Sequence, residues 1–212
     1  DPAAAKGLVK RDIIRVVTPG TVDASMLEGG RSNYICAVCM DDECAGLAFC
    51  DITTGKTHAT SFTGPERLSH VENELGRFSP VEAVLNDGAF QQTGLIDLLR
   101  EKFNCLTQNG GEARFRLEAA AEQVERQFGK DQADRLPKSN SAALLALGGL
   151  LGYLYETQKT DLSHIRELEY YEEGRFMELD LTARRNLELT ATMRDKEKRG
   201  SLLWVLDRTK TA

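Results

Sequence analysis

Three short runs of apolar, β-branched and aromatic residues lie close together within residues 33–62, and they constrain the fold more than any other stretch. The acidic residues 41–43 separate the first run from the second, and Thr54-Gly55 separates the second from the third. Both interruptions stand where a β-hairpin needs its turn, because hairpin connections are short and rich in polar residues and Gly. The stretch therefore predicts a three-stranded antiparallel meander.

Helical periods and short apolar runs alternate after this meander. Residues 65–78 carry apolar side chains at spacings of three and four and predict an amphipathic helix; residues 81–85 predict a short buried strand. A helix over 93–102, a strand over 103–107 and a helix over 117–128 follow, with Gly129 as the C-cap of the last helix. This order packs helices on a mixed sheet, and it is the order of an RNase H-like α/β domain.

A long apolar stretch follows a polar loop expected over residues 131–140. Nearly every position from 142 to 155 is apolar, which predicts a helix over residues 141–158 that is buried on all sides. Gly148, Gly149 and Gly152 each weaken a helix interior, so their presence predicts very close packing against a neighbour.

The character of the sequence changes again beyond residue 160. Residues 164–171 can form an extended piece, Asp180 is a good N-cap for a helix through about Met193, and Ser201 caps a short helix over residues 202–206. About fifty residues of this kind cannot close a core of their own. We therefore expect an α/β domain followed by a truncated all-α segment, as in a fragment of a larger protein.

The formal charge of −6 argues against a chain that binds nucleic acid or an anionic membrane over its whole surface. Any basic site must be local, and Lys10, Arg11 and Arg15 are candidates for one, in and just before a strand predicted over residues 13–17. Such a strand can lie along a DNA phosphate backbone, while a solvated strand at a domain edge is the alternative. No signal segment is recognisable and no apolar run is long enough to span a bilayer, so a cytoplasmic protein is expected.

The five cysteines are odd in number, and free buried thiols in a reducing compartment are expected rather than disulfides. Cys36 and Cys39 have the spacing of a zinc or redox motif. In a strand, however, residues i and i+3 point to opposite faces, so the two sulfurs cannot share a metal ion.

No catalytic constellation stands out. The stretch Thr54-Gly55-Lys56-Thr57 ends like a phosphate-binding loop but lacks the earlier Gly and leads into a strand. The three histidines are too scattered to suggest a site. An RNase H-like fold raises one alternative, a magnesium-dependent nuclease with Asp51 and Asp87 at one sheet edge. Further ligands are missing, and an Asp51 that caps a strand end or turn is the simpler interpretation. We therefore expect no catalytic, cofactor-binding or metal-binding residue.

Several phrases resemble the MutS family of mismatch-repair ATPases. Residues 6–21 (KGLVKRDIIRVVTPGT) resemble the exit of its mismatch-binding domain, and residues 46–55 (GLAFCDITTG) resemble a hairpin of its connector domain. Residues 150–160 (LLGYLYETQKT), 179–189 (LDLTARRNLEL) and 200–211 (GSLLWVLDRTKT) resemble the passage into its helical core, or lever, domain. The resemblance covers the whole chain in the family's order and fits bacterial members.

The resemblance implies three parts. Residues 1–26 would be the tail of the mismatch-binding domain and a linker, residues 27–160 an RNase H-like connector, and residues 161–212 the truncated start of the lever. Such a fragment would be non-catalytic and would transmit conformational change between the mismatch-binding and ATPase domains, with residues 22–32 as a hinge.

The resemblance also implies partners. MutL is the expected protein partner, with Glu122 and Gln123 at the candidate contact positions; a solvated helix face is the alternative for both. Mismatched double-stranded DNA, homodimerisation, ATP and magnesium would belong to the parent protein. The fragment itself is expected to be monomeric, without a cofactor and without membrane contact.

Overall fold

The computed structural model describes residues 16–22, 33–137, 141–159, 162–172, 179–195 and 197–207. Most of the strand predicted over residues 13–17 lies outside these ranges, and the described Val16 and Val17 are not in a strand. The predicted hinge over residues 22–32 also lies outside them, except for Val22.

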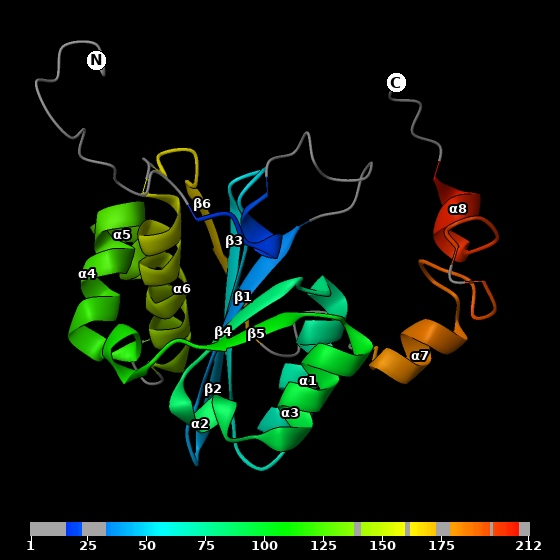
Figure 1. The fold of residues 1–212 in the computed structure, drawn as a ribbon, viewed down its shortest axis with the longest axis horizontal. Helices are drawn as coiled ribbons and strands as arrows, with labels where there is room; N and C mark the ends of the chain where they lie inside the picture. The colour runs from blue at the N-terminus through cyan, green and yellow to red at the C-terminus, as the bar shows by residue number, and fades with distance from the viewer. Residues whose placement is uncertain are drawn as a thin grey trace, which may run out of the picture.

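A six-stranded mixed sheet forms the centre of the molecule (Figure 1), in the order β5-β4-β1-β2-β3-β6. The predicted meander is confirmed, because β1 pairs antiparallel with β2 and β2 pairs antiparallel with β3. β4 joins β1 in parallel, β5 joins β4 in parallel, and β6 joins β3 in parallel. The strands are β1 (Tyr34–Met40), β2 (Cys44–Asp51), β3 (Lys56–Thr63), β4 (Glu82–Leu85), β5 (Leu106–Asn109) and β6 (Glu167–Tyr170).

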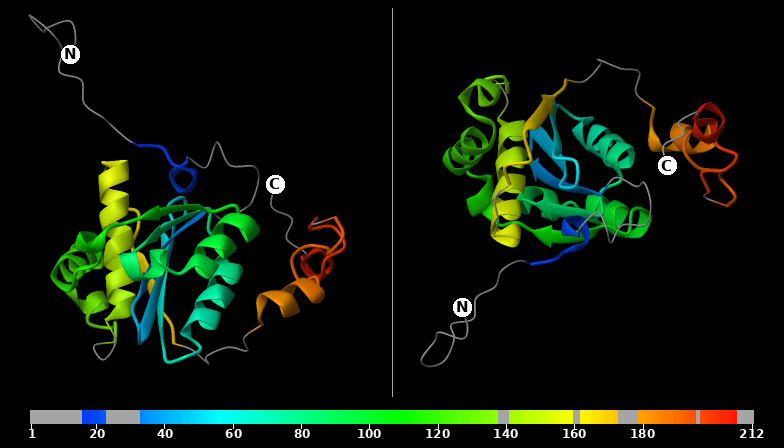
Figure 2. Two further views of the ribbon diagram at one scale, coloured as in Figure 1. Left: turned by 60° about the horizontal axis from the view of Figure 1, so that its bottom comes forward. Right: turned by 90° about the horizontal axis from the view of Figure 1, so that it is seen from above.

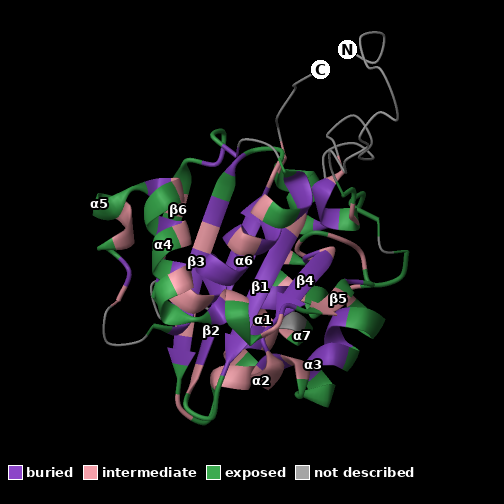
Figure 3. Ribbon diagram, turned by 60° about the vertical axis from the view of Figure 1, so that its left-hand side comes forward, coloured by how far each residue is buried: buried purple, intermediate pink, exposed green. Residues whose placement is uncertain are grey.

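Helices cover both faces of the sheet, so its central strands are buried on both sides (Figures 1 and 3). Side chains alternate along β1, with Ile35, Ala37 and Cys39 in one core and the intervening residues in the other, as the two-residue period of a strand requires. The first core packs against α4 (Leu117–Phe128), α5 (Lys130–Ala133) and α6 (Ala142–Gln158). The second packs against α1 (Arg67–Phe78), α2 (Asp87–Phe90), α3 (Thr93–Asp97) and the π-helical turn η4 (Leu98–Lys102).

The predicted strand over residues 103–107 begins later than expected. The helix predicted before it continues as η4 to Lys102, and Asn104 then adopts a left-handed conformation with φ of 51°. This reversal delays β5 until Leu106. The polar loop expected over residues 131–140 likewise contains the one-turn helix α5 in its described part.

The apolar helix α6 crosses one face of the sheet, as its composition predicts, and most of its residues are buried. A β-carbon on Gly148 would lie 2.3 Å from the Cα of Ala120 in α4, and one on Gly149 would lie 2.5 Å from the Phe115 ring. Close packing is confirmed at both positions but not at Gly152, where the nearest atom is 3.8 Å away. Among the described helices, none has the length and apolar character needed to cross a membrane.

The residues beyond 160 divide between the sheet and a helical segment. β6 extends the sheet beside β3, past the point where the sequence suggests that the α/β domain ends. α7 (Leu181–Asn186) and α8 (Leu202–Leu206) lie beyond α1, away from the sheet (Figure 2). Asp180 and Ser201 cap them as predicted, through bonds from the Ala183 and Trp204 amides. The prediction that the first helix reaches Met193 is wrong, because α7 ends at Asn186 and Glu188 adopts φ of 47°.

Candidate functional site

The two carboxylates of the nuclease hypothesis lie at opposite ends of the sheet. Asp51 pairs with Tyr34 at the start of β1, whereas Asp87 follows Asn86, whose amide donates to the Val38 carbonyl near the end of β1. Five or six strand residues at about 3.3 Å each put the carboxylates roughly 15–20 Å apart. Two catalytic magnesium ions lie within about 4 Å of each other, so one site cannot use both groups. No cluster of three metal-ligating side chains occurs in the described part of the chain.

Asp51 is a turn-forming residue. Its Oδ1 accepts hydrogen bonds from the Thr53 amide at 2.9 Å and from the Thr53 hydroxyl at 2.6 Å. This is the geometry in which an Asp side chain replaces backbone partners at a turn. The structural interpretation of Asp51 is confirmed, and residues 54–57 lead into β3 rather than into a helix.

All five cysteines are free thiols, and four of them lie in the two cores; Cys44 is only half-buried, so the expectation of buried thiols is wrong at that position. Cys36 and Cys39 lie in opposite cores, which confirms that they cannot share an ion. Burial raises the pKa of Cys39, Cys50 and Cys105 to about 12. Thiols with such pKa values are poor nucleophiles at neutral pH.

The histidines do not converge on one site. His58 lies 3.3 Å from Glu169 and packs among Tyr34 and Phe78, while His70 stacks on Phe62. The His164 ring contacts the Ile52 carbonyl at 2.9 Å. Each has a local structural role.

The outer face of α4 carries the two predicted MutL contact positions. Ala120, Val124 and Phe128 face the core, whereas Glu122 is exposed and Gln123 is half-buried beside it. The Gln123 Oε1 is buried and has no hydrogen-bond partner among the described residues. An unsatisfied buried acceptor is costly, so a rotation of the Gln123 side chain that exposes this oxygen would be favoured when a partner supplies a donor.

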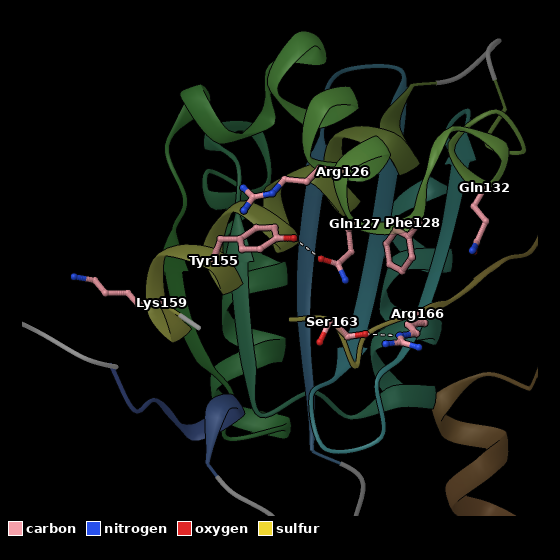
Figure 4. A pocket seen from close by; sticks show the side chains of 8 residues that line it. All are labelled: Arg126, Gln127, Phe128, Gln132, Tyr155, Lys159, Ser163 and Arg166. Atoms are coloured by element: carbon pink, nitrogen blue, oxygen red, sulfur yellow. Dashed lines mark hydrogen bonds between the residues drawn. The ribbon is translucent and has the colours of Figure 1, made fainter. Parts of the chain in front are cut away.

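A groove of about 950 Å³ lies at the C-terminal end of the same helix (Figure 4). Its lining contains three cations and no carboxylate, and none of the three cations forms an ion pair within the described ranges. The guanidinium of Arg126 lies over the Tyr155 ring at 4.3 Å, and the Arg166 Nε donates to the Ser163 carbonyl at 2.6 Å. The lining residues are Arg126, Gln127, Phe128, Gln132, Tyr155, Lys159, Ser163 and Arg166.

Gln127 fixes the floor of this groove. Its Nε2 donates to the Leu162 and Ile165 carbonyls, and its Oε1 accepts from the Tyr155 hydroxyl. These bonds tie α4 to α6 and to the chain leading into β6. The groove therefore has a rigid base, and its basic rim extends the α4 face that begins at Glu122.

Lys10, Arg11 and Arg15, the predicted DNA-proximal residues, lie outside the described residues. The described chain begins next to Arg15, at Val16, whose amide donates to the Thr157 carbonyl at 2.8 Å. This bond brings the start of the described chain to the C-terminal end of α6.

Glu82, the first residue of β4, is not among the residues singled out from the sequence. Its side chain is completely buried, and its neighbours in the strand are apolar. The residue accepts from the Gly20 amide, the Gln108 side chain and the Tyr153 hydroxyl. A lone acidic residue inside a strand predicted to be buried was the available signal, because a buried charge needs dedicated partners.

Comparisons with known proteins point to one family. A family profile described as MutS domain II matches residues 33–166. The chain is 41% identical to the DNA mismatch repair protein MutS of Acetivibrio thermocellus over 215 residues, and 40% identical to that of Ruminiclostridium cellulolyticum over 213 residues. Both alignments cover 100% of the chain and 24% of the relative, so the chain spans about a quarter of the length of the curated relatives it matches.

Proposed function

The chain belongs to the MutS family of DNA mismatch repair proteins, where its central part is domain II, and from this premise we propose that it acts as a non-catalytic connector. In this role it transmits conformational change between the mismatch-binding and ATPase domains of the parent protein and offers a surface to MutL. One observation carries the proposal, namely that a sheet domain with a core on each face presents an exposed polar face of α4.

The proposal includes the RNase H-like fold of the connector and the three-part division at residues 26 and 160. The order of strands and helices along the chain agrees with an RNase H-like domain. The capped helices α7 and α8 fit the start of a helical lever, and β6 would then be a strand that the third part adds to the connector sheet.

The MutL surface is proposed on α4. Glu122 and Gln123 are side by side on the solvent face, and the basic groove begins one turn further along the helix. A partner that covers Glu122 would place acidic groups against Arg126, Lys159 and Arg166 in the groove. Complementary charges of this kind set orientation and association rate more than they set affinity.

Calorimetric titration with the N-terminal ATPase domain of MutL tests this surface. We expect binding by the wild-type chain and a loss of about tenfold in affinity for Glu122→Ala/Gln123→Ala, since contact residues that matter cost more than about 1 kcal/mol when truncated. The matched control is Gln91→Ala/Glu101→Ala, an exposed Gln and Glu on the other side of the sheet. Equal affinities for both double variants, or no binding by the folded wild-type chain, would remove the surface from the proposal.

Other activities are proposed for the parent protein rather than for this chain. The relatives are named for DNA mismatch repair. Contact with mismatched DNA near Lys10, Arg11 and Arg15, homodimerisation, ATP with magnesium, and a cytoplasmic location follow from membership of the family. The connector would serve them by holding its neighbouring parts in a defined geometry.

A further inference from the structure

Residues 16–22, here called the strap, lie against one end of the sheet domain. The strap contains the 3₁₀ turn η2 (Pro19–Thr21), in which Gly20 and Thr21 are buried. Val16 bonds to Thr157 at the end of α6, and the Asn33 side chain donates to the Pro19 carbonyl at 3.1 Å. The strap therefore contacts α6 and the start of β1.

The third attachment is Glu82, which is buried in β4. Its Oε2 accepts from the Gly20 amide at 3.0 Å, while its Oε1 accepts from the Gln108 Nε2 at 2.7 Å and from the Tyr153 hydroxyl at 2.5 Å. The two oxygens of Glu82 thus bind different parts of the molecule. Oε1 binds residues of β5 and α6, and Oε2 binds the strap.

Three donors converge on this carboxyl group, and each oxygen has an acceptor role. An ionised carboxylate is an acceptor only, so it suits such a site better than any neutral side chain of the same length. Burial and the bond to Glu82 raise the pKa of Tyr153 to about 12, so its hydroxyl keeps the proton that it donates. Hydrogen bonds to a charged acceptor are stronger than neutral ones.

Gly20 allows the strap backbone to approach Glu82 closely. A β-carbon on Gly20 would lie 2.2 Å from the Cγ1 of Ile35 and 3.0 Å from the Glu82 Oε2. Only glycine lets the backbone amide approach the carboxylate over the side chain of Ile35. The contact therefore depends on both residues.

We propose that Glu82 is a latch that fixes the strap to the sheet, so that a displacement of the chain at Val16 passes to β1, β4 and α6 through this contact rather than along the hinge predicted over residues 22–32. As part of connector action, this inference rests on the proposed function, and it names Glu82 and Gly20 as its positioning residues. The alternative is that Glu82 only stabilises the sheet and that the strap lies passively against it.

The variant Glu82→Gln distinguishes the latch from the alternative in which the strap lies passively against the sheet. A Gln keeps one acceptor oxygen, which can serve both Gln108 and Tyr153, but its amide group then faces the Gly20 N–H donor to donor. The change removes the bond between Glu82 and the Gly20 amide, while the remaining Oε1 still accepts from Gln108 and Tyr153. The matched control is Asn86→Asp at the other end of β4, where the Asn86 side chain donates to the Met40 carbonyl and accepts from the Met40 amide. Both changes exchange an amide and an acid of equal size, and both cost one buried bond.

Amide hydrogen exchange measured by NMR on the whole chain is the readout. We expect Glu82→Gln to speed exchange of the strap amides by about tenfold relative to the β1 amides, since a buried charged hydrogen bond is worth at least that factor. Asn86→Asp should speed the exchange of amides near Met40. In this variant the exchange rate of the strap amides relative to the β1 amides should stay as in the wild type. Equal effects of both variants on the strap, or an unchanged strap in Glu82→Gln, would overturn the latch.

Gly20→Ala tests the contact from the other side and does not depend on the folding of Glu82→Gln. It should release the same strap amides, and the double variant should add little to either single change because both break one contact. Independent, additive effects would overturn the latch. Failure of the MutL titration with an intact strap response would instead refute the proposed surface and leave the latch standing.

Discussion

Two glycines of α6, Gly148 and Gly152, allow the packing of this helix to be tested, because the same substitution by Ala should affect stability differently at the two positions. In Gly148→Ala the added methyl group would lie 2.3 Å from the Cα and Cβ of Ala120. Since a backbone atom of α4 is involved, the neighbour cannot rotate away. In Gly152→Ala the nearest atoms, in the Arg114 side chain, are 3.8 Å away, which is ordinary contact. The same chemical change is thus blocked at one position and free at the other.

The magnitudes follow from two opposing terms. Replacing Gly by Ala inside a helix stabilises it by about 1 kcal/mol at either position. Overpacking costs about 1–3 kcal/mol, and it applies only at Gly148. The gain in helix stability is the same in both variants, so their free energies of unfolding should differ only by the overpacking cost of about 1–3 kcal/mol. Gly152→Ala should be more stable than the wild type. For a chain of this size that corresponds to several degrees, at about 2–4 °C per kcal/mol.

Urea unfolding followed by far-ultraviolet circular dichroism measures this difference. Fluorescence of Trp204 is unsuitable, because that side chain is exposed on α8 and does not report on the sheet domain. The slope of free energy against urea should be equal in both variants, so that a shift in midpoint is a shift in stability. If Gly148→Ala is as stable as Gly152→Ala, α4 and α6 do not approach as closely as described and the packing argument fails.

Two further predictions concern titration and reactivity. Burial is the main cause that lowers the pKa of His58 below 6.5, with Glu169 opposing and Arg77 assisting, so the folded state binds fewer protons there than the unfolded chain. The free energy of unfolding should therefore be highest above pH 6.5 and should decrease as the pH falls below that value. In His58→Gln the urea midpoint should fall less over the same pH range. A pH profile identical to that of the wild type would contradict this assignment. Among the thiols, the partly exposed Cys44 should react first with iodoacetamide, and mass spectrometry that finds Cys36 or Cys50 modified in the folded chain would contradict their burial.

Elements with strong local signals could be predicted from the sequence. The meander has turn residues at both connections, α4 has Gly129 at its C-cap, and α6 is apolar all round; each is found as expected. The opposite orientations of Cys36 and Cys39 followed from strand geometry alone. In each case the deciding interactions lie within a few residues along the chain.

The remaining features depend on contacts between distant residues. The extended piece predicted over residues 164–171 contains β6, but the sequence did not indicate that this short strand would pair with the edge of β3. Glu82 meets Gly20, 62 residues earlier, and Tyr153, 71 residues later. The groove likewise combines residues from α4, α5, α6 and the chain before β6. No local period encodes such pairings, so a sequence can indicate only that a buried acid needs partners, not which partners it finds.

A connector that transmits motion needs both of its attachments fixed to one rigid body. At the N-terminal side, the strap reaches the sheet through Glu82. At the C-terminal side, β6 pairs with β3, the Tyr171 amide donates to the Ala59 carbonyl at 3.1 Å, and the Tyr171 hydroxyl donates to Glu74 of α1. Burial raises the pKa of Tyr171 far above its usual value, so this hydroxyl remains a donor. Under the proposed function, movement between the sheet and the segment that holds α7 must therefore be taken up after Tyr171. The edge strand β6 then moves with the connector sheet, although it lies beyond the proposed boundary at residue 160.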